Sequence, residues 1–169
     1  MLLELKKGAP KSASNEALGR SVGGFTTKIH LLCDSSGHPL AAHLTAGQTH
    51  ESTCLTSLLE NCELTNEDGD VLLQPIALAG DKGYRAEWID AYLIEQGIQP
   101  VIPSKKNEER SARLVFFDRE QYRQRNIIER LIGWLKESRR ILTRFEKRAA
   151  NYLGMIKVAF IRQYLNLMR

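Results

Sequence analysis

Short apolar runs alternate with amphipathic stretches over most of the chain, and this alternation predicts strands and helices in turn. The apolar runs are short enough for strands, and the first two are separated by Asp34-Ser-Ser-Gly37, a typical turn sequence. The second amphipathic stretch is followed by Gly97, which favours the end of a helix. In order, the pattern predicts strands over 28–33 and 40–44, a helix over 49–61, a strand over 75–81, a helix over 86–96 and a strand over 99–102.

The remaining segments predict a loop-rich start and a helical end. Residues 1–27 are rich in Lys, Gly, Ser and Ala without periodicity, so we expect a basic loop or mobile arm there. An acidic loop follows over 61–70, and a charged connector spans 104–113. From Asp118 to about Arg140 the pattern is helical, and it is helical again over 151–168. Together these elements predict an α/β fold in which helices flank a mixed sheet, with residues 28–169 as one domain.

Composition restricts the class of protein. At 169 residues the chain suits a single globular domain, and its apolar content of 43% and charged content of 26% are ordinary for one. There is neither an apolar run long enough for a membrane span nor a secretory signal. Three cysteines without a CxxC pair indicate reduced thiols rather than a disulfide framework or a zinc site. We therefore expect a cytoplasmic protein without a membrane partner.

Charge is distributed unevenly along the chain. The net charge is +4, yet residues 1–103 carry more acidic than basic side chains, whereas basic side chains predominate over 104–169. A basic segment of this kind suggests a polyanionic partner such as nucleic acid, although a solvated helical face would look the same. On the connector, Lys105, Lys106, Arg110 and Arg113 are candidates for contacts with phosphate groups.

The predicted helix from Asp118 to Arg140 carries a polar stripe beside its apolar face. At about 100° per residue, Tyr122, Arg125, Glu129 and Lys136 fall within an arc of about 60°. The stripe has two interpretations: a functional face, or an exposed face with charge pairs four residues apart, such as Arg125 with Glu129.

Asp81 is a candidate metal ligand because it lies at the end of the predicted buried strand over 75–81, after Gly80. Ligand groups are often found at strand ends in open α/β sheets, although an aspartate there is also a common turn or helix N-cap residue. A carboxylate at a strand end, combined with the helical carboxylate of Glu129, is a suitable pair for Mg²⁺, a hard ion that prefers oxygen ligands. The first candidate site therefore consists of Asp81 and Glu129.

The spacing of Tyr122, Arg125, Glu129 and Lys136 matches the Y-x2-R-x3-E-x6-K signature of bacterial insertion-sequence transposases of the DDE type. Ordered blocks elsewhere resemble the insertion-sequence-five family of these enzymes. They are LGRSVGGFTTK over 18–28, LTAGQTHES over 44–52, AGDKGY over 79–84, VIPS over 101–104 and TRFEKR over 143–148.

This resemblance implies an RNase H-like fold and a catalytic triad of Asp, Asp and Glu that works with Mg²⁺ or Mn²⁺. The second Asp corresponds to Asp81 and the Glu to Glu129, while Tyr122, Arg125 and Lys136 would contact DNA. The reaction implied is phosphodiester cleavage and strand transfer on double-stranded DNA, at transposon ends and target, by a homo-oligomer associated with the bacterial nucleoid.

The sequence departs from the family pattern near its start. The first catalytic Asp is expected on a strand upstream of Lys6-Lys7-Gly8, and the chain has no Asp before Asp34, which lies in the predicted turn. Glu4 is nearer, but the sequence around it shows no strand pattern. We therefore expect a fold that lacks its first strand, from a truncated or second-frame product that would act with an upstream-frame polypeptide. The alternative is a non-catalytic fragment that binds DNA or assists assembly.

Overall fold

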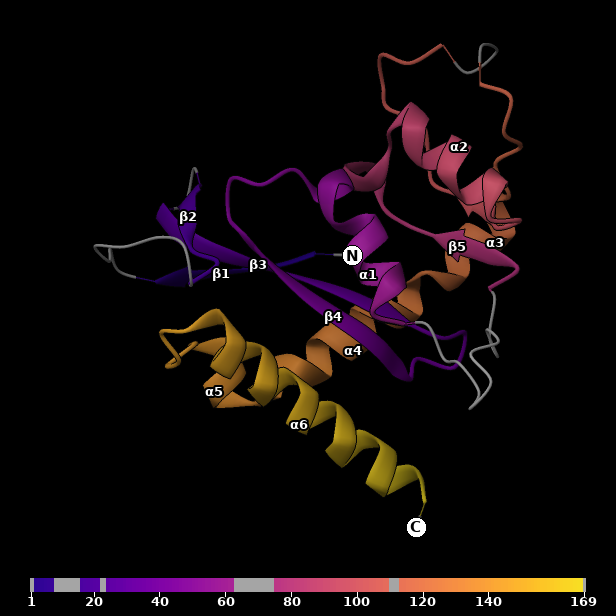
Figure 1. The fold of residues 1–169 in the computed structure, drawn as a ribbon. Coiled ribbons are helices and arrows are strands. Elements are labelled where there is room, and N and C mark those ends of the chain that lie inside the picture. The colour runs from indigo at the N-terminus through magenta and orange to yellow at the C-terminus, as the bar shows by residue number, and fades with distance from the viewer. Residues whose placement is uncertain (1, 8–15, 22–23, 63–74, 110–112, 169) are drawn as a thin grey trace.

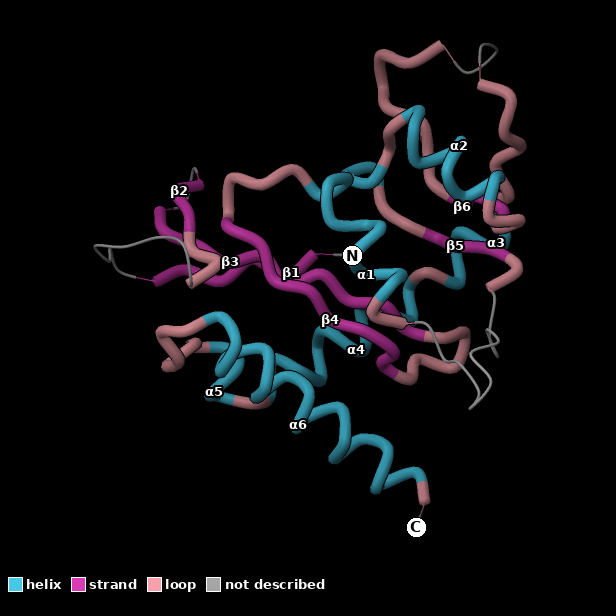
Figure 2. Tube along the Cα trace, viewed as in Figure 1, coloured by secondary structure: helices cyan, strands magenta, loops and turns pink. Residues whose placement is uncertain are grey.

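A computed structural model describes residues 2–7, 16–21, 24–62, 75–109 and 113–168 (Figure 1). Within these ranges the chain folds into a mixed α/β structure with an antiparallel sheet and a small parallel sheet. Figure 2 shows strands β3 and β4 crossing the middle of the molecule, with helices on either side. The predicted α/β class is therefore confirmed, whereas the acidic loop predicted after Asn61 lies mostly outside the described residues.

Strand β3 organises the antiparallel sheet, because each of the other three strands pairs with it. β4 pairs with residues 27–33 of β3, with Ile29 opposite Leu44, while β1 pairs with residues 25–30 and β2 with residues 24–26. The strands are β1 (Leu2–Lys7), β2 (Gly19–Ser21), β3 (Gly24–Cys33) and β4 (Pro39–Ala46). The hairpin is as predicted, but β3 begins at Gly24 rather than at residue 28, and β1 and β2 lie where the sequence predicted a loop or arm.

The parallel sheet consists of β5 (Ala77–Ala79) and β6 (Gln99–Val101). Between them the chain forms the short 3₁₀ helix η2 (Lys82–Tyr84) and helix α2 (Glu87–Glu95). Gly97 ends the helix region with a φ of +71°, a conformation that costs glycine little, and its N–H donates to the carbonyl of Ile94. The predicted strand, helix and strand are confirmed here, with both strands shorter than expected.

The helix predicted over 49–61 and the long helix predicted over 118–140 are each divided. The first forms the 3₁₀ helix η1 (Glu51–Cys54) and then α1 (Leu55–Glu60). The second forms α3 (Arg119–Gln124), α4 (Asn126–Glu137) and α5 (Arg139–Leu142), and α6 (Ala149–Leu167) follows.

Local backbone geometry explains the two breaks after Asp118. At Arg125 the hydrogen bonds tighten to a three-residue spacing, from the Arg125 N–H to the Tyr122 carbonyl and from the Ile128 N–H to the Arg125 carbonyl. At Ser138 the backbone is extended, with φ −77° and ψ 103°. No helix in the described part of the chain is long and apolar enough to cross a membrane.

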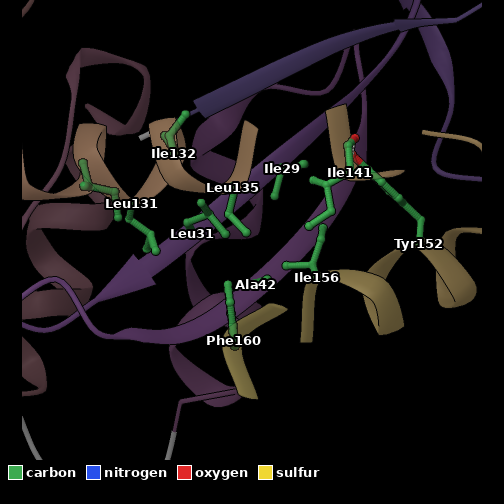
Figure 3. Close-up of a cluster of buried hydrophobic side chains, with 11 residues drawn as sticks. Ile29, Leu31, Ala42, Leu131, Ile132, Leu135, Ile141, Tyr152, Ile156 and Phe160 are labelled. Atoms are coloured by element: carbon green, nitrogen blue, oxygen red, sulfur yellow. Dashed lines mark hydrogen bonds between the residues drawn. The ribbon is translucent and has the colours of Figure 1, made fainter. Parts of the chain in front are cut away.

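Alternate side chains of β3 face two separate cores, because successive residues of a strand point to opposite faces. Ile29 and Leu31 join a cluster with the apolar faces of α4, α5 and α6, which Figure 3 shows around Leu135, Ile156 and Phe160. Leu32 faces the other way and packs against a cluster from η1, α1, η2 and α2. The antiparallel sheet therefore has helices on both faces, and the second face carries the two 3₁₀ helices that form the candidate site.

Candidate functional site

Asp81 lies two residues beyond the end of β5 and is the N-cap residue of η2. Its side-chain Oδ1 accepts a hydrogen bond of 2.8 Å from the N–H of Gly83, so the residue caps the 3₁₀ helix, as the alternative interpretation predicted. The side chain is half-buried and lines a shallow pocket of about 420 Å³ together with Glu51, Lys82, Gly83 and Tyr122. Capping therefore fixes the turn while leaving the carboxylate at the edge of a pocket.

Tyr84 anchors the Asp81 turn to the sheet. Its side chain is 3% exposed, and its hydroxyl forms a hydrogen bond of 2.8 Å with Nδ1 of His30 on β3. Nε2 of His30 forms another of 2.8 Å with the hydroxyl of Thr45 on β4. Burial, with a smaller contribution from the neighbouring His43, lowers the pKa of His30 to about 4, so the imidazole is neutral at pH 7. Burial also raises the pKa of Tyr84, which keeps its hydroxyl protonated as a hydrogen-bonding group.

Glu51 is a second carboxylate beside Asp81, and it is a site residue that was not predicted from the sequence. It begins η1 and forms an ion pair of 2.6 Å with Nζ of Lys28 on β3. Burial opposes ionisation of Glu51, but the hydrogen bond and charge of Lys28, a backbone hydrogen bond and nearby His50 together hold the pKa of the carboxyl below its usual value. In the sequence, Glu51 and Ser52 follow His50 in the block LTAGQTHES, which resembles the transposase family. Nothing within that block indicates that Glu51 lies beside Asp81.

Arg125 links Tyr122 to Glu129. Its guanidinium lies 5.3 Å from the centre of the Tyr122 ring and donates a hydrogen bond of 3.0 Å to Glu129 Oε1. The predicted charge pair four residues apart is therefore present, and the side chain of Glu129 is 49% exposed. Tyr122 lines the Asp81 pocket, whereas Arg125, Glu129 and Lys136 do not, and Lys136 is exposed in the last turn of α4. The structure thus brings Tyr122 to Asp81 and connects Glu129 to that pair through Arg125.

A divalent metal ion fits the chemistry of the donors around Asp81. A Cβ placed on Gly83 would lie 3.0 Å from Asp81 Oδ1 and 3.2 Å from the carboxyl carbon of Glu51, so the two carboxylates lie close together on either side of Gly83. Hard cations such as Mg²⁺ prefer oxygen donors of this kind. Within the described ranges, no group of three or more His, Cys, Asp or Glu side chains is close enough to hold a metal ion together.

The charged connector contains exposed lysines and one buried arginine. Lys105 and Lys106 are exposed, which leaves them available to a phosphate. Arg113 is not available: its Nε and Nη2 donate to both oxygens of Asp90 at 2.8 and 2.9 Å, and its side chain is 4% exposed. Its predicted phosphate contact is therefore wrong, because the guanidinium instead holds the connector to α2. Arg110 lies outside the described residues.

Two further predictions concern Asp34 and Glu4. Asp34 is confirmed as a turn residue, because its Oδ1 accepts hydrogen bonds of 2.8 Å from the N–H groups of Ser36 and His38. Glu4 was expected to lack a strand, but it lies in β1 opposite Lys28. The strand next to the one that carries Lys28 therefore includes a carboxylic residue.

The sequence is similar to known transposases. Residues 6–163 match the family described as "Transposase DDE domain". A putative transposase for insertion sequence element IS402 from Burkholderia cepacia is 30% identical over 152 residues, which cover 89% of this chain and 67% of the relative. A putative transposase for insertion sequence element IS6501 from Brucella ovis is 29% identical over 135 residues, or 80% of this chain and 95% of the relative. No solved structure matches the chain.

Proposed function

We propose, because the chain belongs to the DDE-domain transposase family, that it carries part of the site for metal-dependent phosphodiester cleavage and strand transfer on double-stranded DNA. Within that family we assign it to the insertion-sequence-five group and to the RNase H-like fold. The antiparallel pairing around β3, the parallel β5–β6 pair and the helices on both faces support this fold. The proposed partners are transposon ends, target DNA and further copies of the transposase.

One observation carries the proposal: Asp81, two residues beyond the end of β5, shares a pocket with Tyr122 of the signature helix region. These two residues lie far apart in the sequence, and they come from the two motifs that the family pattern assigns to the catalytic site. Arg125 then connects Tyr122 to Glu129 through a ring contact and an ion pair. The arrangement supports a site where η2 meets Tyr122 of α3, with Glu129 of α4 connected to it through Arg125.

In the proposed site Asp81 and Glu129 would hold Mg²⁺ or Mn²⁺. A bound divalent ion would activate the attacking oxygen and stabilise the charge on the leaving oxygen during phosphodiester displacement. Glu129 is half-exposed and paired with Arg125, so ligand binding would require the carboxylate to be shared or released. The released guanidinium could then donate to a DNA phosphate, for which its planar fork is well suited.

Tyr122, Lys136, Lys105 and Lys106 would position the DNA. The phenol of Tyr122 lies at the pocket, where it can contact a phosphate or sugar close to the scissile bond. The three lysines are exposed and carry positive charge, which favours binding to the phosphate backbone irrespective of sequence.

A strand-transfer assay tests the proposal. The protein, alone and with the upstream segment of its reading frame added, is incubated with Mg²⁺, a pre-cleaved transposon end and a target plasmid. We expect Asp81→Asn and Glu129→Gln each to lower joining by at least about 100-fold, because charge developing at the reacting phosphate loses its stabilisation. Glu137→Gln, an exposed carboxylate in the last turn of α4, is the matched control and should retain activity.

The same assay separates the two candidate functions. Joining that survives Glu129→Gln would overturn the assignment of this residue as a metal ligand. If neither form of the protein joins DNA while both bind it, the chain would function as a DNA-binding or assembly fragment.

A further inference from the structure

We infer that Glu51, held in place by Lys28, is a positioning residue for the Asp81 turn, an inference that rests on the proposed function. Neither residue belongs to the signature or to the pair of proposed metal ligands. Both come from the segment before β5, and they meet Asp81 only in the folded chain. The inference therefore depends on three contacts in the structure.

The first contact fixes Glu51 to the sheet. Lys28 lies on β3, and its Nζ donates to Glu51 Oε1 at 2.6 Å and to the backbone carbonyl of Thr49 at 2.9 Å. The side chains of Lys28 and Glu51 are only 12% and 17% exposed, so solvent competes little with this ion pair. Lys28 therefore fixes both the backbone before η1, at Thr49, and the side chain of Glu51, the first residue of η1.

The second contact places Glu51 against the turn that Asp81 caps. The positions closest to a Cβ on Gly83 are Asp81 Oδ1 at 3.0 Å and Cγ and Cδ of Glu51 at 3.1 and 3.2 Å. The φ of Gly83 is not in the positive region that favours glycine, so a side chain here would be opposed by close packing rather than by backbone conformation. Glu51 thus forms one wall of the turn, and Asp81 forms the other.

The third contact holds the far end of the same turn. Tyr84 is hydrogen-bonded to His30, whose side chain leaves β3 on the same face as that of Lys28, two residues earlier. The two polar side chains of β3 therefore fix η1 and η2 against each other. A carboxylate that must meet a metal ion within fractions of an ångström depends on such supporting contacts.

Binding of Mn²⁺ provides a readout that does not require turnover. Mn²⁺ affinity is measured by electron paramagnetic resonance, and thermal unfolding is measured without metal, for the full chain and its variants. We expect Asp81→Asn to abolish Mn²⁺ binding at the site. Glu51→Gln and Lys28→Met should each weaken it by about 10-fold, the size usual for residues that orient a metal ligand. The exposed Glu60 at the end of α1 supplies the matched control, since Glu60→Gln should bind as the unmodified chain does.

Exchanging the two charges tests positioning against a purely structural role. In the double variant Lys28→Glu with Glu51→Lys the ion pair can re-form, so thermal stability should recover relative to Lys28→Met. Mn²⁺ affinity should stay low, because the side chain next to Asp81 is then cationic. Recovery of both quantities would reduce Glu51 to a structural residue and overturn the inference.

Failure of the inference is distinguishable from failure of the proposed function. In one outcome, Asp81→Asn abolishes Mn²⁺ binding, but the affinities of Glu51→Gln and Lys28→Met stay within about 2-fold of the unmodified chain, well short of the expected loss of about 10-fold. The metal site then stands, and the positioning role of Glu51 is wrong. If Asp81→Asn leaves binding unchanged, the proposed metal site is wrong, and the role of Glu51 is wrong with it.

Discussion

Acidification should destabilise the folded chain through His30, which is fully buried between Tyr84 and Thr45. Burial lowers the pKa of this imidazole from 6.5 to about 4, with a smaller contribution from His43. Between these two values the unfolded chain binds a proton that the folded chain does not. Stability therefore rises with pH through this window and falls as the pH drops from 6.5 towards 4.

The size of the effect follows from the same two pKa values. A proton that binds at 6.5 in the unfolded state and at about 4 in the folded state gives a maximum loss of about 3 kcal/mol. Around pH 5, most unfolded chains and few folded ones are protonated at this residue, so we expect a loss of about 2 kcal/mol relative to pH 7. His43 also has a lowered pKa and adds a loss of the same sign.

Urea unfolding at pH 7 and near pH 5 measures this loss, with His30→Gln as the variant that cannot titrate. Only the change between the two pH values is compared, so any destabilisation that the substitution itself causes is removed. The unmodified chain should lose about 2 kcal/mol more than His30→Gln. His43→Gln should keep the His30 contribution. If the unmodified chain and His30→Gln lose the same amount, the assignment of His30 as a buried neutral histidine is refuted.

Two other predictions concern the connector between β6 and α3. Replacing Arg113 by Met should lower the free energy of unfolding by about 2 kcal/mol, because Asp90 loses two charge-assisted hydrogen bonds while its ion pair of 3.0 Å with Arg85 remains. Urea unfolding measures this loss, with the exposed Arg119→Met as control, and an equal loss in both variants would contradict the reasoning. The double variant of Lys105→Gln and Lys106→Gln should bind all DNA sequences more weakly. In fluorescence anisotropy, the slope of the logarithm of affinity against the logarithm of salt concentration should become shallower by about 2. A loss of affinity for one DNA sequence alone would contradict phosphate contact.

Local pattern was sufficient to predict the elements that depend on local chemistry. The hairpin of β3 and β4 follows from two apolar runs around an Asp-Gly turn, and Gly97 ends the helix before β6 as expected. Periodicity alone did not predict where the signature helix breaks, since neither Gly nor Pro lies between Arg119 and Ile132 to mark a break. The strand pairing of residues 2–7 was also missed, because Leu2–Lys7 lacks the alternation of apolar and polar residues that identifies a strand.

Contacts between distant segments set the limit of prediction at the candidate site. Asp81, Tyr122 and Glu129 were identified from a strand end and a helix spacing, both of which are readable in short windows of sequence. The pair of Lys28 and Glu51 spans 23 residues and two elements, so no single window contains it. Arg113 shows the opposite error: its charge suggested a surface role, but its partner Asp90 lies 23 residues away on α2 and holds it in the interior. The role of a charged residue can therefore be read from short windows of sequence only when its partner is nearby in the sequence. Glu51, which lies beside the turn around Gly83, has its partner Lys28 on a different strand, so its place in the site could not be predicted.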